Sequence, residues 1–286
     1  METVNFNHWV ITLVCVDGPG IVHAVTGAIA DAGGNITESQ QFTSLGTGRF
    51  FMRLEVESIA DRAALEAKLI PVVKRFKMDW TLDVVGRPIQ TLILVSKEGH
   101  CLADLLFRNS AGQLGIDVPL VLSNHPDLGK LAGFYEIPFE TLQVNSNSDM
   151  RAFEDRLIEV VTESEIELVV LARFMRVLSP ETCTALAGKA INIHHSFLPG
   201  FKGANPYRQA HERGVKLIGA TAHFVTDDLD EGPIIEQNVV RVDHSSSPEA
   251  LKRIGQNEES RTLTQAVGWL AQRRVLLDGK RTVIFH

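Results

Sequence analysis

Beyond about residue 90 the chain alternates short apolar segments with amphipathic helical segments, and this alternation limits its fold more than any other feature. Residues 166–171 form a continuous apolar run, which is typical of a parallel strand buried on both faces. The segment before it places Phe153 and Leu157 on one helical face. Repeated units of this kind predict an α/β domain with a doubly wound, mostly parallel sheet. Ligands in such sheets bind at the carboxyl ends of the strands.

The first 85 residues follow a different pattern, with two helical segments set among four strand-like ones. Asp61 predicts the N-cap of the second helix, and Gly33-Gly34-Asn35 predicts the end of the first. The expected order is strand, helix, strand, strand, helix, strand, which is the ferredoxin-like βαββαβ arrangement. We therefore expect one domain at residues 1–85, a linker at 86–90 and a second domain at 91–286.

The expected elements can be given by residue number. In the first domain we expect strands at 8–16, 36–42, 49–57 and 78–85, and helices at 21–32 and 61–76. In the second we expect strands at 91–95, 118–123, 134–138, 166–171, 190–193, 216–225, 233–242 and 282–285, and helices at 102–113, 150–163 and 248–277.

Length, charge and cysteine usage exclude several classes of protein. The chain has 286 residues, enough for about two domains at the usual ~100–200 residues each. Its net charge of −7 gives no basic field for nucleic acid or an anionic membrane. No apolar run approaches the ~18–20 residues that span a bilayer. Three widely spaced cysteines form no disulfide framework or zinc ribbon, so we expect a cytoplasmic protein.

The residues that could carry chemistry cluster between positions 191 and 232. Asn192 and His194 follow an apolar strand two positions apart, so both side chains point the same way. An amide can donate to a developing oxyanion, and an imidazole can shuttle a proton. A loop with four acidic residues, Asp227 to Glu231, follows a second strand. A carboxylate from that loop could orient the imidazole or take a proton from water.

Structural interpretations compete with this one. An Asn after a strand is commonly a turn residue, a histidine in a half-buried strand can be purely structural, and an acidic loop is often only solvated. Metal binding is another use of His194, His195, His223 and Asp230. No standard ligand spacing supports it, so we expect no metal.

Three motifs in one order resemble the formyltransferase family that uses 10-formyltetrahydrofolate. They lie at residues 192–199, 223–233 and 171–180, and the resemblance extends over about 90–286. It implies that Asn192, His194 and Asp230 form the catalytic triad. It also implies that the pterin ring lies against two loops, formed by Met175, Arg176, Val177 and Leu178 and by Val225, Thr226 and Asp227.

The first domain resembles an ACT domain, a small-ligand regulatory module, and the βαββαβ order agrees with this. The resemblance implies regulatory-ligand contacts from residues of the first loop and of the second strand: Asp17, Gly18, Pro19, Gly20, Ile21, Asn35 and Ile36. It further implies small amino-acid effectors, such as glycine or methionine, and a homo-oligomer formed through these domains. The alternative is that Gly18-Pro19-Gly20 is only a tight turn.

An ACT domain ahead of a formyltransferase-like domain resembles the architecture of the formyltetrahydrofolate deformylase family. The segment 201–207 also resembles that family. The resemblance implies hydrolysis of 10-formyltetrahydrofolate to formate and tetrahydrofolate without a cofactor. Such a reaction feeds purine synthesis and balances one-carbon pools.

Two departures from the transformylases bear on the acceptor. Residues 96–102, where those enzymes cradle a ribonucleotide phosphate, hold a single glycine and an acidic Glu98, which is a poor phosphate nest. Water is therefore the expected acceptor. His195 stands where transformylases usually have proline, and it could hold water or merely pack.

Two other functions stay open, as does one residue's role. The protein could pass the formyl group to an amine of a nucleotide or an aminoacyl-tRNA, although its acidic charge argues against tRNA. It could instead be a non-catalytic folate and amino-acid sensor. For Asp230 two roles are possible: direct removal of a proton from water, or orientation of His194.

Overall fold

The computed structural model describes residues 6–200 and 206–286 and divides into two compact units. The first unit consists of the chain up to Arg87 together with Gln272–His286, and the second unit consists of Pro88–Ala271. The chain passes from the first to the second unit inside the segment expected to be a linker. Each unit is described by itself.

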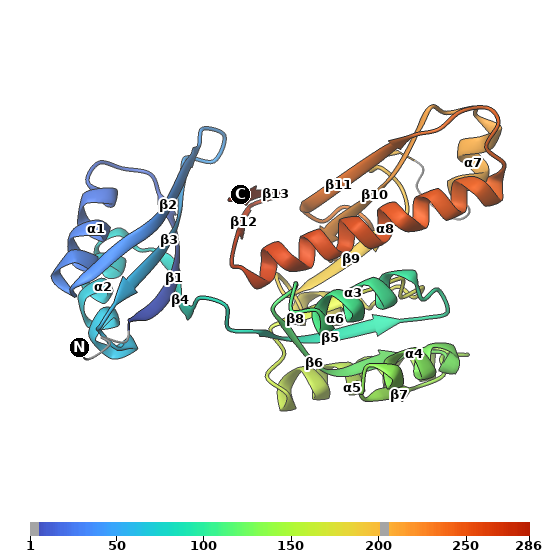
Figure 1. Ribbon diagram of the computed structural model, residues 1–286, viewed down its shortest axis with the longest axis horizontal. Helices are drawn as coiled ribbons and strands as arrows, with labels where there is room; N and C mark the ends of the chain where they lie inside the picture. The colour runs from blue at the N-terminus through green and yellow to red at the C-terminus, as the bar shows by residue number, and fades with distance from the viewer. Residues whose placement is uncertain (1–5, 201–205) are drawn as a thin grey trace. The chain divides into compact units, whose positions relative to one another are not determined.

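The first unit contains a four-stranded antiparallel sheet in the order β2-β3-β1-β4 (Figure 1). The elements run in the predicted βαββαβ order. They are β1 (Asn7–Val16), α1 (Ile21–Asp31), β2 (Gly34–Ser44), β3 (Arg49–Ser58), α2 (Arg62–Phe76) and β4 (Asp79–Val84). The ferredoxin-like prediction is therefore confirmed.

Helices α1 and α2 cover one face of this sheet. Ile11 and Leu54 of the sheet pack with Val25 of α1 and Leu69 of α2 in one buried cluster. Asp61 is the N-cap of α2, as predicted, because its carboxylate accepts from the Ala64 amide at 2.8 Å.

The C-terminal fifteen residues correct two expectations. The predicted helix 248–277 ends at Ala271, and Gln272–His286 belongs to the first unit rather than to the second domain. These residues form a hairpin of β12 (Val275–Asp278) and β13 (Arg281–Ile284). The physical reason is the second face of the first unit's sheet. Val14 and Phe51 on that face are apolar, and Val283 and Phe285 bury them.

The second unit contains a seven-stranded sheet in the order β11-β10-β9-β8-β5-β6-β7. Its elements are β5 (Ile89–Val95), α3 (His100–Ser110), β6 (Ile116–Ser123), η1 (Pro126–Leu128), α4 (Gly129–Phe134), β7 (Phe139–Thr141), α5 (Asn147–Glu163), β8 (Leu168–Leu171), α6 (Pro180–Ala185), β9 (Ala190–His194), α7 (Pro206–Glu212), β10 (Leu217–Phe224), β11 (Ile234–Arg241) and α8 (Pro248–Ala271). Strands β5 to β9 pair in parallel, whereas β10 and β11 are antiparallel. The mostly parallel sheet is confirmed.

One predicted strand is displaced. Residues 134–138 were expected to be extended, but α4 ends at Phe134 and the strand is Phe139–Thr141. The helix cannot continue because Glu136 has a φ of 59°, a left-handed conformation outside the helical range.

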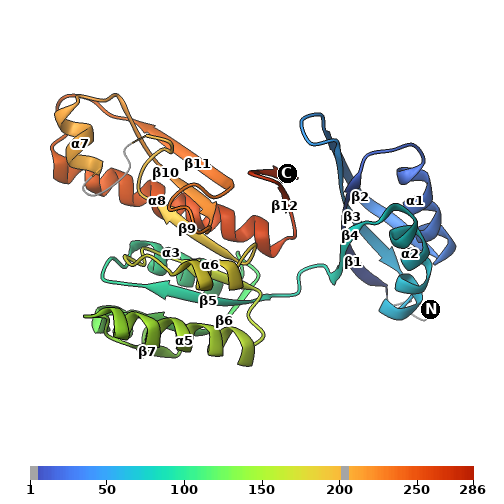
Figure 2. The ribbon, with the colours of Figure 1, turned by 180° about the vertical axis from the view of Figure 1, so that it is seen from behind.

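Helices cover the second unit's sheet on both faces. On one face, Phe153 and Leu157 of α5 and Cys183 of α6 pack against Leu92 and Leu122. On the other, α8 contacts α3 and runs across β9, β10 and β11 (Figures 1 and 2). The strand order reverses between β5 and β8, and the carboxyl ends of strands beside such a switch point are where open α/β sheets bind ligands.

Candidate active site

A cavity of about 320 Å³ lies at the carboxyl ends of β8 and β9 in the second unit. The three predicted catalytic residues, Asn192, His194 and Asp230, all line it. So do the seven residues predicted to hold the pterin: Met175, Arg176, Val177, Leu178, Val225, Thr226 and Asp227. The fold thus brings together residues from three separate segments of the chain.

The register of β9 and β10 positions the polar side chains. Asn192 and His194 lie two residues apart on β9 and therefore share a face of the sheet. Because β10 is antiparallel to β9, His223 lies directly opposite Asn192. Asn192 Nδ2 and His223 Nε2 are 3.4 Å apart, and His223 Nδ1 donates to the Phe224 carbonyl at 2.8 Å.

Asp230 reaches both imidazoles from the loop after β10. Its Oδ2 lies 3.2 Å from His194 Nδ1, and its Oδ1 lies 3.6 Å from His223 Nε2. Its backbone has a φ of 58°, which non-glycine residues rarely adopt. Burial alone would raise the pKa of the Asp230 carboxyl, but hydrogen bonds from His194 and His223 hold that pKa well below its ordinary value. The carboxyl is therefore an anion at neutral pH.

The two ring nitrogens of His194 differ in their surroundings, because Nδ1 contacts Asp230 and Nε2 does not. Its side chain is nearly buried, and among the described residues Nε2 has no hydrogen-bond partner. A buried nitrogen without a partner is costly unless something else satisfies it. The His194 side chain lines the cavity, and Nε2 is its ring nitrogen without a partner among the described residues.

Hydrogen bonds to Ser96 and Val144 hold the loop at Met175–Leu178 in place. The Met175 amide donates to Ser96 Oγ at 3.0 Å, and Ser96 in turn donates to Asn124 at 2.6 Å. Arg176 donates to the Val144 carbonyl at 2.7 Å. The side chains of Met175 and Val177 are exposed, so the loop presents apolar surface.

The second loop begins at Val225, directly after β10. The Val225 amide donates to the Ala190 carbonyl at 2.8 Å, and the Thr226 hydroxyl donates to the Asp228 carbonyl at 2.9 Å. Asp227 is exposed at its outer side. The first bond ties the loop to Ala190, the first residue of the strand that carries Asn192 and His194, and the second lies within the loop.

Sequence reasoning missed a buried cluster beside this cavity. We call it the Glu259 cluster: Glu259 of α8, His100 of α3, Arg173, Tyr207 and His195. Glu259 has no exposed area, and its Oε2 lies 2.8 Å from His100 Nε2 and 3.2 Å from Arg173 Nε. The Tyr207 hydroxyl donates to its Oε1. Glu259 sits in a polar stretch of a long helix, where the sequence gives no sign of burial.

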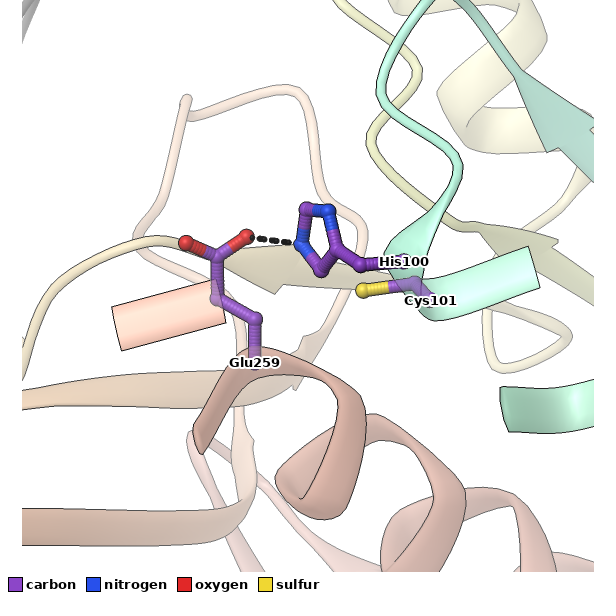
Figure 3. Close-up of side chains that lie close together, drawn as sticks. All are labelled: His100, Cys101 and Glu259. Atoms are coloured by element: carbon purple, nitrogen blue, oxygen red, sulfur yellow. Dashed lines mark hydrogen bonds and ion pairs between the residues drawn. The ribbon is translucent and has the colours of Figure 1, made fainter. Parts of the chain in front are cut away.

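His100, Cys101 and Glu259 form a group whose possible metal-ligand atoms lie within 4.8 Å of one another. Figure 3 shows these side chains from α3 and α8 pointing toward one another. The charges do not suit a cation, however. The Arg173 guanidinium contacts the same Glu259 oxygen as His100, and burial holds the pKa of the Cys101 thiol well above its ordinary value. The group fits an ion-pair network better than a metal centre.

The start of α3 does not resemble a phosphate site. Gly99 is its N-cap, and Glu98 beside it makes a 2.7 Å ion pair with Lys252. The hydrogen bond from Lys252 lowers the pKa of the Glu98 carboxyl, so an anion stands where a phosphate would need cations and free amides.

The residues predicted to bind a regulatory ligand fall into two groups in the first unit. Asp17, Gly18, Pro19 and Gly20 form the loop between β1 and α1, and Ile21 is the first, buried residue of α1. Asn35 and Ile36 lie near the start of β2, with Asn35 exposed. Val16 pairs with Arg49, whereas Asn35 pairs with Glu57 at the other end of β3. In one chain the two groups are therefore at opposite ends of the sheet.

Two findings complete the description. No helix in the described part of the chain is long and apolar enough to cross a membrane. The segment 201–205, part of the predicted motif 201–207, lies outside the described residues.

The fold and the site together define a class: a formyltransferase-type domain joined to an ACT domain. Family models agree, because "Formyl transferase" matches residues 89–267 and "ACT domain" matches residues 9–71. The chain is 48% identical over 280 residues to the formyltetrahydrofolate deformylase of Corynebacterium sp. strain P-1, covering 97% of this chain and 98% of that protein. This chain belongs to the formyltetrahydrofolate deformylase family, as the sequence predicted.

Solved structures give the same result. The formyltetrahydrofolate deformylase from Burkholderia mallei matches with a TM-score of 0.94 and 48% identity, covering 98% of this chain and 100% of that one. A glycinamide ribonucleotide transformylase from Symbiobacterium toebii matches with a TM-score of 0.66 and 32% identity, covering 72% of this chain and 98% of that one. The catalytic fold is thus shared with an enzyme named for transfer.

Proposed function

We propose that the second unit hydrolyses 10-formyltetrahydrofolate to formate and tetrahydrofolate, with water as the formyl acceptor. The observation that carries the proposal is the arrangement of Asn192, His194 and Asp230 around one cavity. His194 is held through Nδ1 at 3.2 Å from Asp230 and leaves Nε2 for the reaction. The relative from Burkholderia mallei is named a formyltetrahydrofolate deformylase, which supports the same substrate and reaction.

In the proposed mechanism, water attacks the formyl carbon while His194 Nε2 takes its proton. The new C–O bond turns the formyl oxygen into an oxyanion, which the Asn192 amide stabilises. The C–N10 bond then breaks, and N10 receives a proton from the His194 imidazolium. Loss of one such oxyanion donor typically costs about 2.7–4 kcal/mol of barrier.

The geometry favours an orienting role for Asp230. Both of its carboxylate oxygens face imidazole nitrogens, at 3.2 Å from His194 and 3.6 Å from His223. A carboxylate engaged in this way fixes Nδ1–H of His194 toward itself, so that Nε2 carries the lone pair. Direct proton removal by Asp230 would require it to leave these contacts.

The remaining features of the site support water rather than a nucleotide amine. Glu98 places a negative charge at the start of α3, which disfavours a phosphate there. The pterin ring is assigned to the two loops at Met175–Leu178 and Val225–Asp227. Hydrolysis transfers no electrons, so the proposed reaction needs no redox cofactor.

We also propose that the first unit binds a small amino acid, such as glycine or methionine, between two copies of the chain. The two predicted contact groups lie at opposite ends of the sheet, and β2 is an edge strand. A second copy whose β2 runs antiparallel to this one would bring its Asn35 to the end where Asp17–Ile21 lie. This supports a homo-oligomer.

The three cysteines support a cytoplasmic enzyme. Cys15, Cys101 and Cys183 are free and buried. Free thiols persist in a reducing compartment, where the one-carbon pool and purine synthesis would use the formate and tetrahydrofolate released.

The test is to mix the protein with 10-formyltetrahydrofolate without an acceptor and to measure formate. Steady release supports hydrolysis. Release only with an added amine would support transfer, and binding without release would support a sensor.

Asp230→Asn should reduce turnover more than tenfold while folate binding and Tm stay nearly unchanged, because the neutral amide cannot hold His194 in the reactive tautomer. The matched control is Asp228→Asn, an exposed neighbour in the same loop, which should retain full turnover. An Asp230→Asn variant that keeps more than a tenth of wild-type turnover would contradict the assignment.

A further inference from the structure

The Glu259 cluster is connected to the catalytic histidine through two side chains. Arg173 Nη1 donates to His195 Nδ1 while its Nε faces Glu259 at 3.2 Å. The His195 ring stacks on the His194 ring, with centroids 4.9 Å apart and planes 20° apart. Glu259, Arg173, His195 and His194 therefore form one continuous chain of contacts. The proposed mechanism uses only the last of them.

Arg173 is held in a conformation that few arginines adopt. Its φ is 64°, in the left-handed region that favours glycine, and such residues cost about 1–3 kcal/mol each. Its side chain is nearly buried, and it lies two residues before Met175, the first residue of the loop predicted to contact the pterin. Strain of this kind persists where the surrounding structure and function hold it in place. The buried Glu259 carboxylate is the group that holds this guanidinium.

His195 separates two cavities. It lines the substrate cavity together with Arg173 and His194, and it also lines a second cavity of about 280 Å³ beside Tyr207. His195 therefore borders both spaces, and its ring accepts a hydrogen bond from Arg173 and stacks on His194. We call His195 and Arg173 the wall.

We propose that His195 and Arg173 determine acceptor specificity, by closing the side of the formyl site where an amine acceptor would otherwise approach. Water passes this wall and an amine does not. The inference rests on the proposed function. The second unit shares its fold with an enzyme named as a transformylase, at 32% identity. The proposal explains how one fold can use water as the formyl acceptor in one protein and an amine in another.

In hydrolysis, the water oxygen bonds to the formyl carbon, the C–N10 bond breaks and N10 gains a proton. With hydroxylamine, its nitrogen bonds to the formyl carbon instead, N10 again gains a proton, and the product is formohydroxamic acid. The ratio of hydroxamate to formate measures how well an amine competes with water.

Two variants of the full-length protein open the wall in different ways. His195→Ala removes the ring and leaves the Arg173–Glu259 pair in place. Arg173→Gly removes the guanidinium and puts at this position the residue that a φ of 64° favours. His211→Ala is the matched control, because His211 is exposed and its Nδ1 donates to the backbone carbonyl of Ser246.

Wild type and His211→Ala should release formate at the same rate with and without hydroxylamine. In each folded wall variant the hydroxamate-to-formate ratio should rise at least tenfold, with Tm confirming the fold. An unchanged ratio in the folded variants overturns the inference, and so does the loss of both products with folate still bound, which would make these positioning residues. Absence of formate from the wild type would instead overturn the proposed function.

Discussion

At the scale of single residues, two residues of opposite charge with a left-handed backbone conformation line the same cavity. Arg173 and Asp230 have φ values of 64° and 58°. Each left-handed non-glycine residue costs about 1–3 kcal/mol and is kept where neighbouring groups hold it. Glu259 holds Arg173, and His194 holds Asp230. Backbone strain is thus located where a formyl group would react.

His223 should position Asn192. Its Nδ1 donates to a backbone carbonyl at 2.8 Å, and its Nε2 lies 3.4 Å from Asn192 Nδ2 and 3.6 Å from Asp230 Oδ1. A hydrogen bond of this kind is worth about 0.5–1.5 kcal/mol, so His223→Ala should lower kcat by roughly 2- to 12-fold. KM for the folate should stay unchanged, because His223 holds a group that acts in the transition state. Steady-state kinetics that show a raised KM with normal kcat would contradict this role.

The sequence indicated some of these residues and not others. Asn192 and His194 are visible because their spacing of two places them on one face of a strand. His223 appeared in a motif, but its role depends on the register of β10 against β9, which is a long-range pairing. Arg173 and Glu259 meet across elements 86 positions apart in the chain (259 − 173), and no local pattern predicts such an ion pair.

At the scale of elements, the C-terminal hairpin covers the second face of the first unit's sheet. Arg53 of β3 is only 2% exposed, and its guanidinium bonds Glu55 at 2.6 Å and the Gln272 carbonyl at 3.1 Å. Asp278 of β12 accepts from Ser44 at 2.7 Å and Thr47 at 2.6 Å. The C-terminal residues therefore supply hydrogen-bond acceptors to Arg53, Ser44 and Thr47 of the first unit.

Asp278→Ala should destabilise the first unit. The substitution leaves the buried Ser44 hydroxyl without its acceptor, which costs about 1–3 kcal/mol. Denaturant unfolding should show the transition of this unit at a lower midpoint. The matched control is Asp79→Ala, whose side chain is 84% exposed in its pair with Arg49 and should have little effect. Equal midpoints for the two variants would contradict the prediction.

At the scale of the whole molecule, each unit has its own hydrophobic core. The chain crosses between the units twice, at Arg87–Pro88 and at Ala271–Gln272. The second crossing follows α8, the helix that also carries Glu259. The sequence predicted a second domain that ends at residue 286, but the second unit ends at Ala271. A fragment that contains only this unit must therefore stop at residue 271.

Two fragments should behave differently. A fragment of residues 88–271 should be folded and monomeric, should hydrolyse 10-formyltetrahydrofolate, and should not respond to glycine or methionine. A fragment of residues 88–286 should self-associate, because Val283 and Phe285 lose the sheet face that buries them. Size-exclusion chromatography with light scattering distinguishes the two. Equal monomer content in the two fragments would contradict the predicted self-association. An amino-acid response from residues 88–271 would contradict the assignment of regulation to the first unit.

The sequence by itself determined the βαββαβ order, the mostly parallel second sheet, and the clustering of Asn192, His194 and Asp230. It could do so because strand and helix periods are local and because the motifs that contain these three residues resemble those of a known family. Only the tertiary structure decided the place of the C-terminal hairpin and the pairing of Arg173 with Glu259. Both depend on which buried surfaces and charges meet across distant segments, and no local period encodes that.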